Sequence, residues 1–163
     1  MNHYRAHREY YLELPDNHFV SYPDVYSPAL RALALKPFLA KNDTVINESA
    51  LWLHTGFYPC HVLDKVKTAR LDGRKRKGSV RRRIPAQHLQ LIEGIFTTTL
   101  ERTAADLLLS DLELGITAIP KIIRAGSNIQ KIQNLVNSLN GIQGLSCVRS
   151  VLSQLREVPA LAG

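Results

Sequence analysis

The residues best suited to chemistry in this 163-residue chain are the cations between Lys65 and Arg83. Ten of the 21 lysines and arginines lie in this segment and Asp72 is its only acid, so the segment carries +9 and the remainder −2, which together give the total of +7. Clustered cations neutralise phosphates, which gives affinity that falls steeply with salt and carries little sequence information. The basic segment, residues 65–83, therefore predicts a polyanionic partner; a solvated charged loop and a docking site for an acidic or RNA-loaded protein are the alternatives.

We expect the phosphate contacts of the basic segment to come from its arginines and lysines, with a glycine-flanked turn at its tip. Neutral replacements of residues 74–77 should lower affinity for nucleic acid and flatten its dependence on salt. The predicted nucleic-acid-binding side chains are Lys67, Arg70, Arg74, Lys75, Arg76, Lys77, Arg81, Arg82 and Arg83.

Other chemistry has little support in the sequence. It contains no phosphate-binding loop, no dinucleotide fingerprint, no nucleophile elbow and no carboxylate pair with metal-binding spacing. Cys60 and Cys147 are too few and too far apart for a thiolate metal site, and we expect each to be a small buried hydrophobe. We therefore predict a protein that is not an enzyme, with no catalytic residue, cofactor or metal.

Arg102 and Asp106 lie four residues apart in a helical pattern and can pair across one turn. One interpretation is a structural ion pair. The other makes Arg102 a ligand for a partner's carboxylate or phosphate, because its planar fork suits bidentate contacts.

The elements that position these residues are organised around residues 93–109. Glu93-Gly94 predicts a turn between a strand at 88–92 and a strand at 95–98, and Thr98 with Glu101 predicts a capping box that starts the next helix. Residues 61–63 and 79–84 predict further strands, so that a meander of three or four strands precedes this helix.

Along the chain, we expect some helices before the strands of the sheet and others after them. Ser27-Pro28 predicts one helix start, and Asn47 predicts another as the cap of a helix that Gly56 ends. After the sheet, residues 111–124 predict a helix divided by Pro120, Ser127 with Gln130 predicts a second capping box, and a last apolar stripe follows Gly144. Trp52 is expected in the core and His54 is expected to be a hydrogen-bonded structural histidine.

These elements predict an α+β fold: a small antiparallel or mixed sheet of three to five strands with N-terminal helices and a C-terminal run of three to four helices. We expect residues 1–26 to form a leader or a short hairpin around Pro15-Asp16-Asn17, residues 27–158 to form one domain, and residues 159–163 to form a tail. A cytoplasmic protein without a membrane partner is expected, because no apolar run is long enough to span a bilayer and no signal peptide is evident.

Three motifs resemble those of the AbiEi-type antitoxins of type IV toxin-antitoxin systems, in the branch common among actinobacteria. T-T-T-L-E-R-T-A-A-D-L-L, residues 97–108, resembles the family's "T-S-P-x-R-T-A-x-D-L"; residues 48–56, E-S-A-L-W-L-H-T-G, resemble its "H-E-S-A-A-x-L-H-G"; and residues 78–85, G-S-V-R-R-R-I-P, resemble its "G-V-x-V-H-R-x-x-L-P". Order and spacing agree from about Pro28 to Leu155. The family-motif residues that match are Ser49, His54, Arg83, Arg102 and Asp106.

The resemblance implies a bacterial antitoxin and transcription regulator that counters a nucleotidyltransferase-like toxin, by effect and without a stable complex, and that binds operator DNA. Two positions depart from the motifs: Asn47 stands where the family has histidine, and Arg81-Arg82 stand where it has Val-His. The winged helix-turn-helix of the family has no clear counterpart in residues 1–26. The alternatives are a sequence-tolerant DNA- or RNA-binding module acting through residues 65–83, and a shortened relative without function; the oligomeric state is not indicated.

Overall fold

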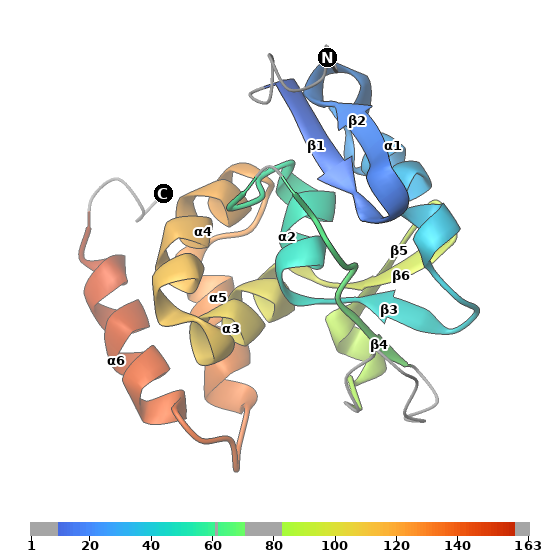
Figure 1. Cartoon of the computed structure of the whole chain (residues 1–163). Coiled ribbons are helices and arrows are strands. Elements are labelled where there is room, and N and C mark those ends of the chain that lie inside the picture. The colour runs from blue at the N-terminus through green and yellow to red at the C-terminus, as the bar shows by residue number, and fades with distance from the viewer. Residues whose placement is uncertain (1–9, 61, 71–82, 159–163) are drawn as a thin grey trace. The chain divides into compact units, whose positions relative to one another are not determined.

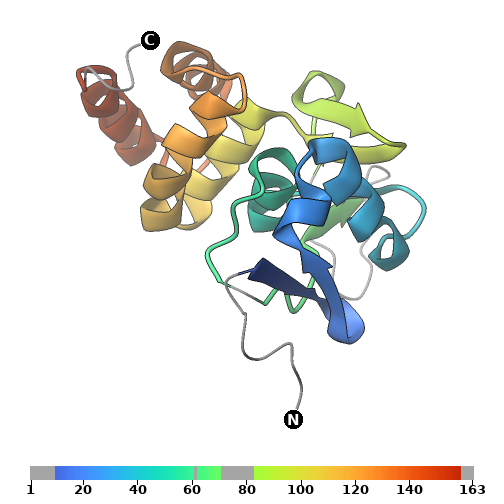
Figure 2. The ribbon, with the colours of Figure 1, turned by 90° about the horizontal axis from the view of Figure 1, so that it is seen from above.

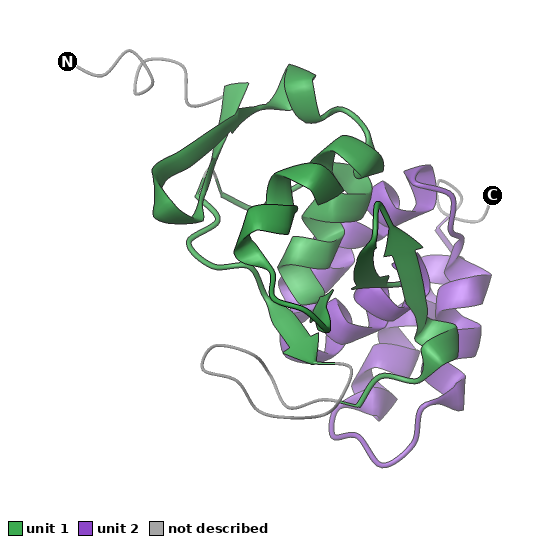
Figure 3. Cartoon of the chain, turned by 90° about the vertical axis from the view of Figure 1, so that its right-hand side faces the viewer, with its two compact units in different colours: residues 1–98 green, residues 99–163 purple. Residues whose placement is uncertain are grey.

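A computed structural model describes residues 10–60, 62–70 and 83–158. The chain forms two compact units, residues 1–98 and residues 99–163 (Figure 3). The first unit contains two small sheets and two helices, one between the two sheets in sequence and one between the first two strands of the larger sheet, and the second contains a run of four helices (Figure 1). The predicted α+β class is confirmed. The predicted single domain over residues 27–158 stays a prediction.

The main sheet of the first unit has four strands in the order β4-β3-β6-β5. The strands are β3 (Asp43–Val45), β4 (Thr68–Arg70), β5 (Leu89–Ile92) and β6 (Ile95–Thr98). Strands β3 and β6 pair in parallel while the other pairs are antiparallel, so the sheet is mixed. The expected meander is wrong, because β3 inserts between β4 and β6.

Two strand predictions need correction. Val62 forms only an isolated bridge with Glu13, and the strand in this region is β4, seven residues downstream of the predicted start at His61. Of the strand predicted at 79–84, residues 79–82 lie outside the described residues, and Arg83 and Ile84 are not in a strand.

The turn between β5 and β6 is as predicted. Glu93 has φ 48° and Gly94 has φ 77°, the two positive values that a tight two-residue hairpin turn needs. The register Ile92↔Ile95 closes the hairpin at the turn, and Leu91↔Phe96 places those two side chains opposite each other.

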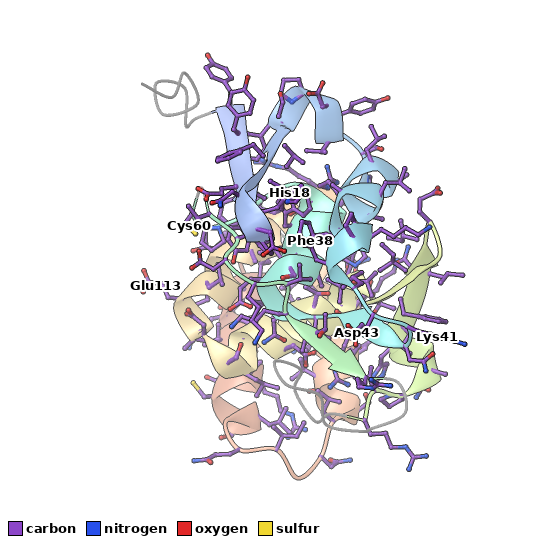
Figure 4. All side chains as sticks on the ribbon, turned by 45° about the vertical axis from the view of Figure 1, so that its right-hand side comes forward. His18, Phe38, Lys41, Asp43, Cys60 and Glu113 are labelled. Carbon is purple, nitrogen blue, oxygen red and sulfur yellow. The ribbon has the colours of Figure 1, made fainter. Side chains whose placement is uncertain are left out.

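The N-terminal hairpin belongs to the core of the first unit. Strands β1 (Tyr11–Leu14) and β2 (His18–Ser21) are antiparallel and turn through Pro15–Asn17, as expected. Leu12 and Leu14 are buried, and the His18 ring packs edge-on against Phe38 with ring centroids 5.4 Å apart (Figure 4). Residues 10–26 thus form a hairpin and a short turn, and no helix-turn-helix is present in this described stretch.

Two helices complete the first unit. In α1 (Pro28–Leu35), the Ser27 hydroxyl accepts a hydrogen bond from the Leu30 N–H, which confirms the predicted cap. In α2 (Asn47–Thr55), the predicted Asn47 cap is wrong: Ile46 holds the cap position without a side-chain bond, and Asn47 is the first helical residue with φ 51°. Gly56, at φ 74°, ends α2 as expected.

The core of this unit combines residues from the hairpin, both helices and the sheet, which explains why the elements form together. Trp52 is fully buried, as predicted. The buried apolar side chains of this cluster are Leu12, Leu14, Val25, Ala32, Leu35, Val45, Ala50, Trp52, Leu53, Leu63, Val66 and Ile95.

The second unit consists of α3 (Leu100–Ser110), α4 (Leu112–Arg124), α5 (Ile129–Ser138) and α6 (Leu145–Arg156). Helix α3 packs against each of the other three, and the four lie together in two views (Figures 1 and 2). A Cβ atom built on Gly115 would lie 2.7 Å from the Leu108 backbone, so only glycine allows α4 to pass α3 this closely.

Both predicted capping boxes are displaced by one residue. Thr99, not Thr98, accepts from the Arg102 N–H, and Asn128, not Ser127, accepts from the Lys131 N–H. Ser127 instead donates its hydroxyl to Glu101 Oε1 at 2.7 Å.

Helix α4 is continuous through Pro120, contrary to the prediction. Proline removes the donor for the carbonyl of Ile116, which is 38% exposed, and water can satisfy a carbonyl on that side. The predicted burial of the cysteines is also wrong, because Cys60 and Cys147 are exposed.

Candidate nucleic-acid interface

The described part of the basic segment, residues 65–70 and residue 83, starts just before β4 and includes that strand. Lys67 and Arg83 are exposed and Arg70, the last residue of β4, is half-buried. Among the described residues β4 is an edge strand, since it pairs only with β3. The other predicted phosphate-binding residues, Arg74, Lys75, Arg76, Lys77, Arg81 and Arg82, lie outside the described residues.

The start of the basic segment is fixed by hydrogen bonds on both sides of Lys67. The Lys67 N–H donates to the hydroxyl of Ser49 at 2.9 Å, and the Lys67 carbonyl accepts from the Ile46 N–H at 3.0 Å. Ser49 is fully buried in α2. The cationic side chain of Lys67 therefore extends into solvent from a backbone that α2 holds in place.

His54, the second residue carried by the α2 motif, is 7% exposed and has a structural contact. Its Nε2 lies 2.7 Å from the Thr98 carbonyl oxygen. A carbonyl can only accept, so Nε2 carries the proton and donates. The bond joins α2 to the end of β6, in agreement with the prediction of a hydrogen-bonded structural histidine.

Arg31 is a buried cation that the sequence did not single out. Its guanidinium donates to the carbonyls of Val25 at 2.8 Å, Leu53 at 2.8 Å and His54 at 3.0 Å. Burial lowers the pKa of Arg31 to about 10, so it remains charged at neutral pH. Two of these carbonyls belong to the last turn of α2, whose negative end a cation stabilises. The only signal in the sequence is an arginine inside an otherwise apolar helix.

Arg102 and Asp106 form the predicted i, i+4 pair within the second unit. Arg102 Nε and Asp106 Oδ1 are 2.9 Å apart, and the two side chains are 5% and 0% exposed. This burial matches the interpretation as a structural ion pair; both residues lie on α3 and neither is in the same unit as the basic segment.

Tyr58, in the first unit, lies near several other ionisable side chains. Burial, together with the charges of Cys60, Glu48 and Asp64, raises the pKa of Tyr58 to about 12. The Cys60 thiol donates to the Val62 carbonyl at 2.8 Å. Among the described residues, no three histidine, cysteine or acidic side chains are placed to hold a metal ion.

The structure thus separates the predicted site residues by role. Ser49 and His54 each bond to a backbone group of the first unit, and Arg102 and Asp106 pair side chain to side chain within α3. Lys67, Arg70 and Arg83 are the described residues of the predicted nucleic-acid-binding set. In the described part of the chain no helix has the length and apolar character needed to cross a membrane. No family model, curated protein or solved structure matches the chain.

Proposed function

We propose that this chain is a regulatory protein of the AbiEi antitoxin kind. In this proposal it is a non-catalytic protein of the bacterial cytoplasm that counters a nucleotidyltransferase-like toxin and binds nucleic acid, including operator DNA, through residues 65–83. The toxin is a functional partner and need not form a stable complex with it.

The observation that carries the proposal is the hydrogen bond between the Ser49 hydroxyl and the Lys67 N–H. It joins one of the three motifs on which the resemblance depends to the start of the basic segment. A motif that fixes the backbone where the basic segment enters the sheet, just before β4, is consistent with a protein whose working surface is that segment. Phosphate contacts made from a positioned backbone cost less side-chain and loop ordering on binding.

The N-terminal hairpin favours this route to nucleic acid over a recognition helix. Residues 10–26 contribute core side chains such as Leu12 and Leu14, and contain no helix that could enter a major groove. Binding through the cations of residues 65–83 should therefore depend strongly on salt.

A titration against DNA tests the binding part of the proposal. The full chain is titrated against a labelled duplex from upstream of its own gene and against a scrambled duplex, at low and at moderate salt. The double variant Lys67→Gln, Arg83→Gln should bind more weakly, with a slope of log affinity against log salt smaller by about 2, one for each phosphate that is no longer neutralised. A matched double variant of exposed cations in the second unit, Lys131→Gln, Arg156→Gln, should bind like the parent.

The outcomes separate the hypotheses. Tighter binding to the upstream duplex that persists at moderate salt supports an operator-binding regulator. Equal binding to both duplexes that collapses with salt supports the sequence-tolerant module. Absence of binding at low salt overturns the nucleic-acid role.

Co-expression with a nucleotidyltransferase-like toxin from the same operon tests the antitoxin part. Growth restored by the parent chain supports it. Failure of the parent chain to restore growth, with both proteins expressed, removes the antitoxin proposal.

A further inference from the structure

A pocket of about 320 Å³ opens at the end of the main sheet where β3 and β6 begin. It is lined by Lys36, by residues 39–43 and by residues 94–96. Its volume is at the lower end of the roughly 300–1,000 Å³ found for small-molecule sites, which suits one nucleotide better than a larger ligand.

The pocket exists because β3 and β6 are parallel neighbours. The register Thr44↔Phe96 places the two strand starts at the same end of the sheet, so the segments that lead into them lie side by side. Asn42, at φ 70°, and Gly94, at φ 77°, are the residues at which the chain turns into each strand. The Asp43 carboxylate holds the first of these loops, since its Oδ2 accepts from the Ala40 N–H at 2.9 Å.

An exposed aromatic ring lies on one wall of the pocket. Phe96 is 37% exposed between Ile95 and Thr97, which are buried, so its side chain points away from the core face of β6. Its cross-strand partner Leu91 is 59% exposed. The two side chains form an apolar platform, and aromatic rings at such positions stack on nucleobases of any sequence.

Two lysines line the same pocket as Phe96. Lys36 and Lys41 are exposed and line the pocket with a single carboxylate, that of Asp43. Lys41 and Asp43 are labelled in Figure 4. The register Asp43↔Arg70 places the end of β4 at this same end of the sheet, so the basic segment leaves the sheet beside the pocket. A phosphate backbone that contacts Arg70, the last residue of β4, would continue towards Lys41.

We propose that this pocket binds one unstacked nucleotide of a single-stranded nucleic acid, with its base against Phe96 and its phosphates near Lys36 and Lys41. The inference deepens the proposed function and depends on it for the rest of the strand. A single strand is required because the bases of a duplex keep their faces stacked inside it, out of reach of an aromatic side chain.

Fluorescence anisotropy of labelled oligonucleotides tests the pocket. The full chain is titrated with a mixed-sequence single strand and with the duplex of the same sequence. Phe96→Leu keeps an apolar side chain but removes the ring, and should weaken single-strand binding about tenfold, which corresponds to the lower part of the range measured for base–aromatic stacking. Lys41→Gln should reduce the salt slope by about 1. Tyr26→Leu, at an aromatic residue that is 78% exposed in the same unit, is the matched control and should bind like the parent.

Two results would overturn the pocket while leaving the proposed function intact. One is Phe96→Leu and Tyr26→Leu with the same affinity for the single strand. The other is an effect of Lys67→Gln, Arg83→Gln without any effect at Phe96 or Lys41. Absence of binding to either oligonucleotide at low salt would overturn both. Circular dichroism of each variant establishes that a loss of affinity is not a loss of fold.

Discussion

Replacing Arg31 by methionine should destabilise the first unit by about 3–5 kcal/mol. The change keeps most of the aliphatic length of the side chain and removes the guanidinium that donates to the carbonyls of Val25, Leu53 and His54. Arg31 is 4% exposed, and a buried acceptor without its donor costs about 1–3 kcal/mol. Three such carbonyls would cost at most about 9 kcal/mol. We expect the lower part of this range, because the last turn of α2 can recover some bonds with water.

Urea unfolding followed by the fluorescence of Trp52 measures the effect. Trp52 is the single tryptophan of the chain and is fully buried in the same unit, so its emission reports on that unit. With a typical urea slope of about 1–3 kcal/mol/M, the midpoint should fall by about 2 M. Arg31→Lys should lose about half as much, because an ammonium keeps the charge but lacks the rigid fork.

The control is Arg83→Met, which removes an exposed cation from the same unit and should stay within about 0.5 kcal/mol of the parent. If Arg31→Met also lies within about 1 kcal/mol of the parent, the carbonyls do not depend on the guanidinium, and the assignment of Arg31 as the cation that completes α2 is wrong.

Three further changes test other interactions. Asp106→Asn removes the negative charge that pairs with buried Arg102 across one turn of α3 and should cost about 3 kcal/mol, seen as a lower midpoint of thermal unfolding; an unchanged midpoint would contradict the ion pair. Gly115→Ala should cost about 1–3 kcal/mol because its Cβ would meet the α3 backbone at Leu108; a raised midpoint, as helix propensity alone predicts, would contradict the close approach. The pKa of Tyr58 is raised from 10.0 to about 12, so the neutral phenol contributes fully to stability below pH 10, and that contribution is lost as pH rises towards 12. In an alkaline absorbance titration, Tyr58→Phe should remove the phenol that ionises at the highest pH. Loss of a phenol that ionises near pH 10 would contradict the raised pKa.

The strand, turn and helix from 89 to 110 could be predicted because each signal is local. Glu93-Gly94 allows only a few turn types, and the change from alternating to helical periodicity falls within a few residues. The cap was displaced by one residue because Thr97, Thr98 and Thr99 are chemically alike, and only the path of the backbone decides which hydroxyl faces the first turn.

The parallel pairing of β3 with β6 could not be predicted, because its partners are far apart in sequence. Thr97 Oγ1 donates to the Val45 carbonyl across 52 positions, and no local pattern encodes that bond. Arg31 was missed for a related reason, since two of its acceptors are 22 and 23 residues away.

In the candidate site, too, one part could be predicted from a local pattern and another part could not. Local charge density was enough to identify the basic segment. The pocket was not predicted because its two lining segments meet only through the β3–β6 register.

The parallel pairing of β3 with β6 also decides when each unit can fold while the chain is synthesised on the ribosome. Strand β3 is made early, yet its partner β6 is among the last residues of the first unit, so the main sheet cannot close until residue 98 has left the exit tunnel. The second unit is built from helices that follow each other directly, and its helices can pack as soon as its chain emerges. The sheet-containing unit should therefore be the slow step in folding, even though its sequence comes first.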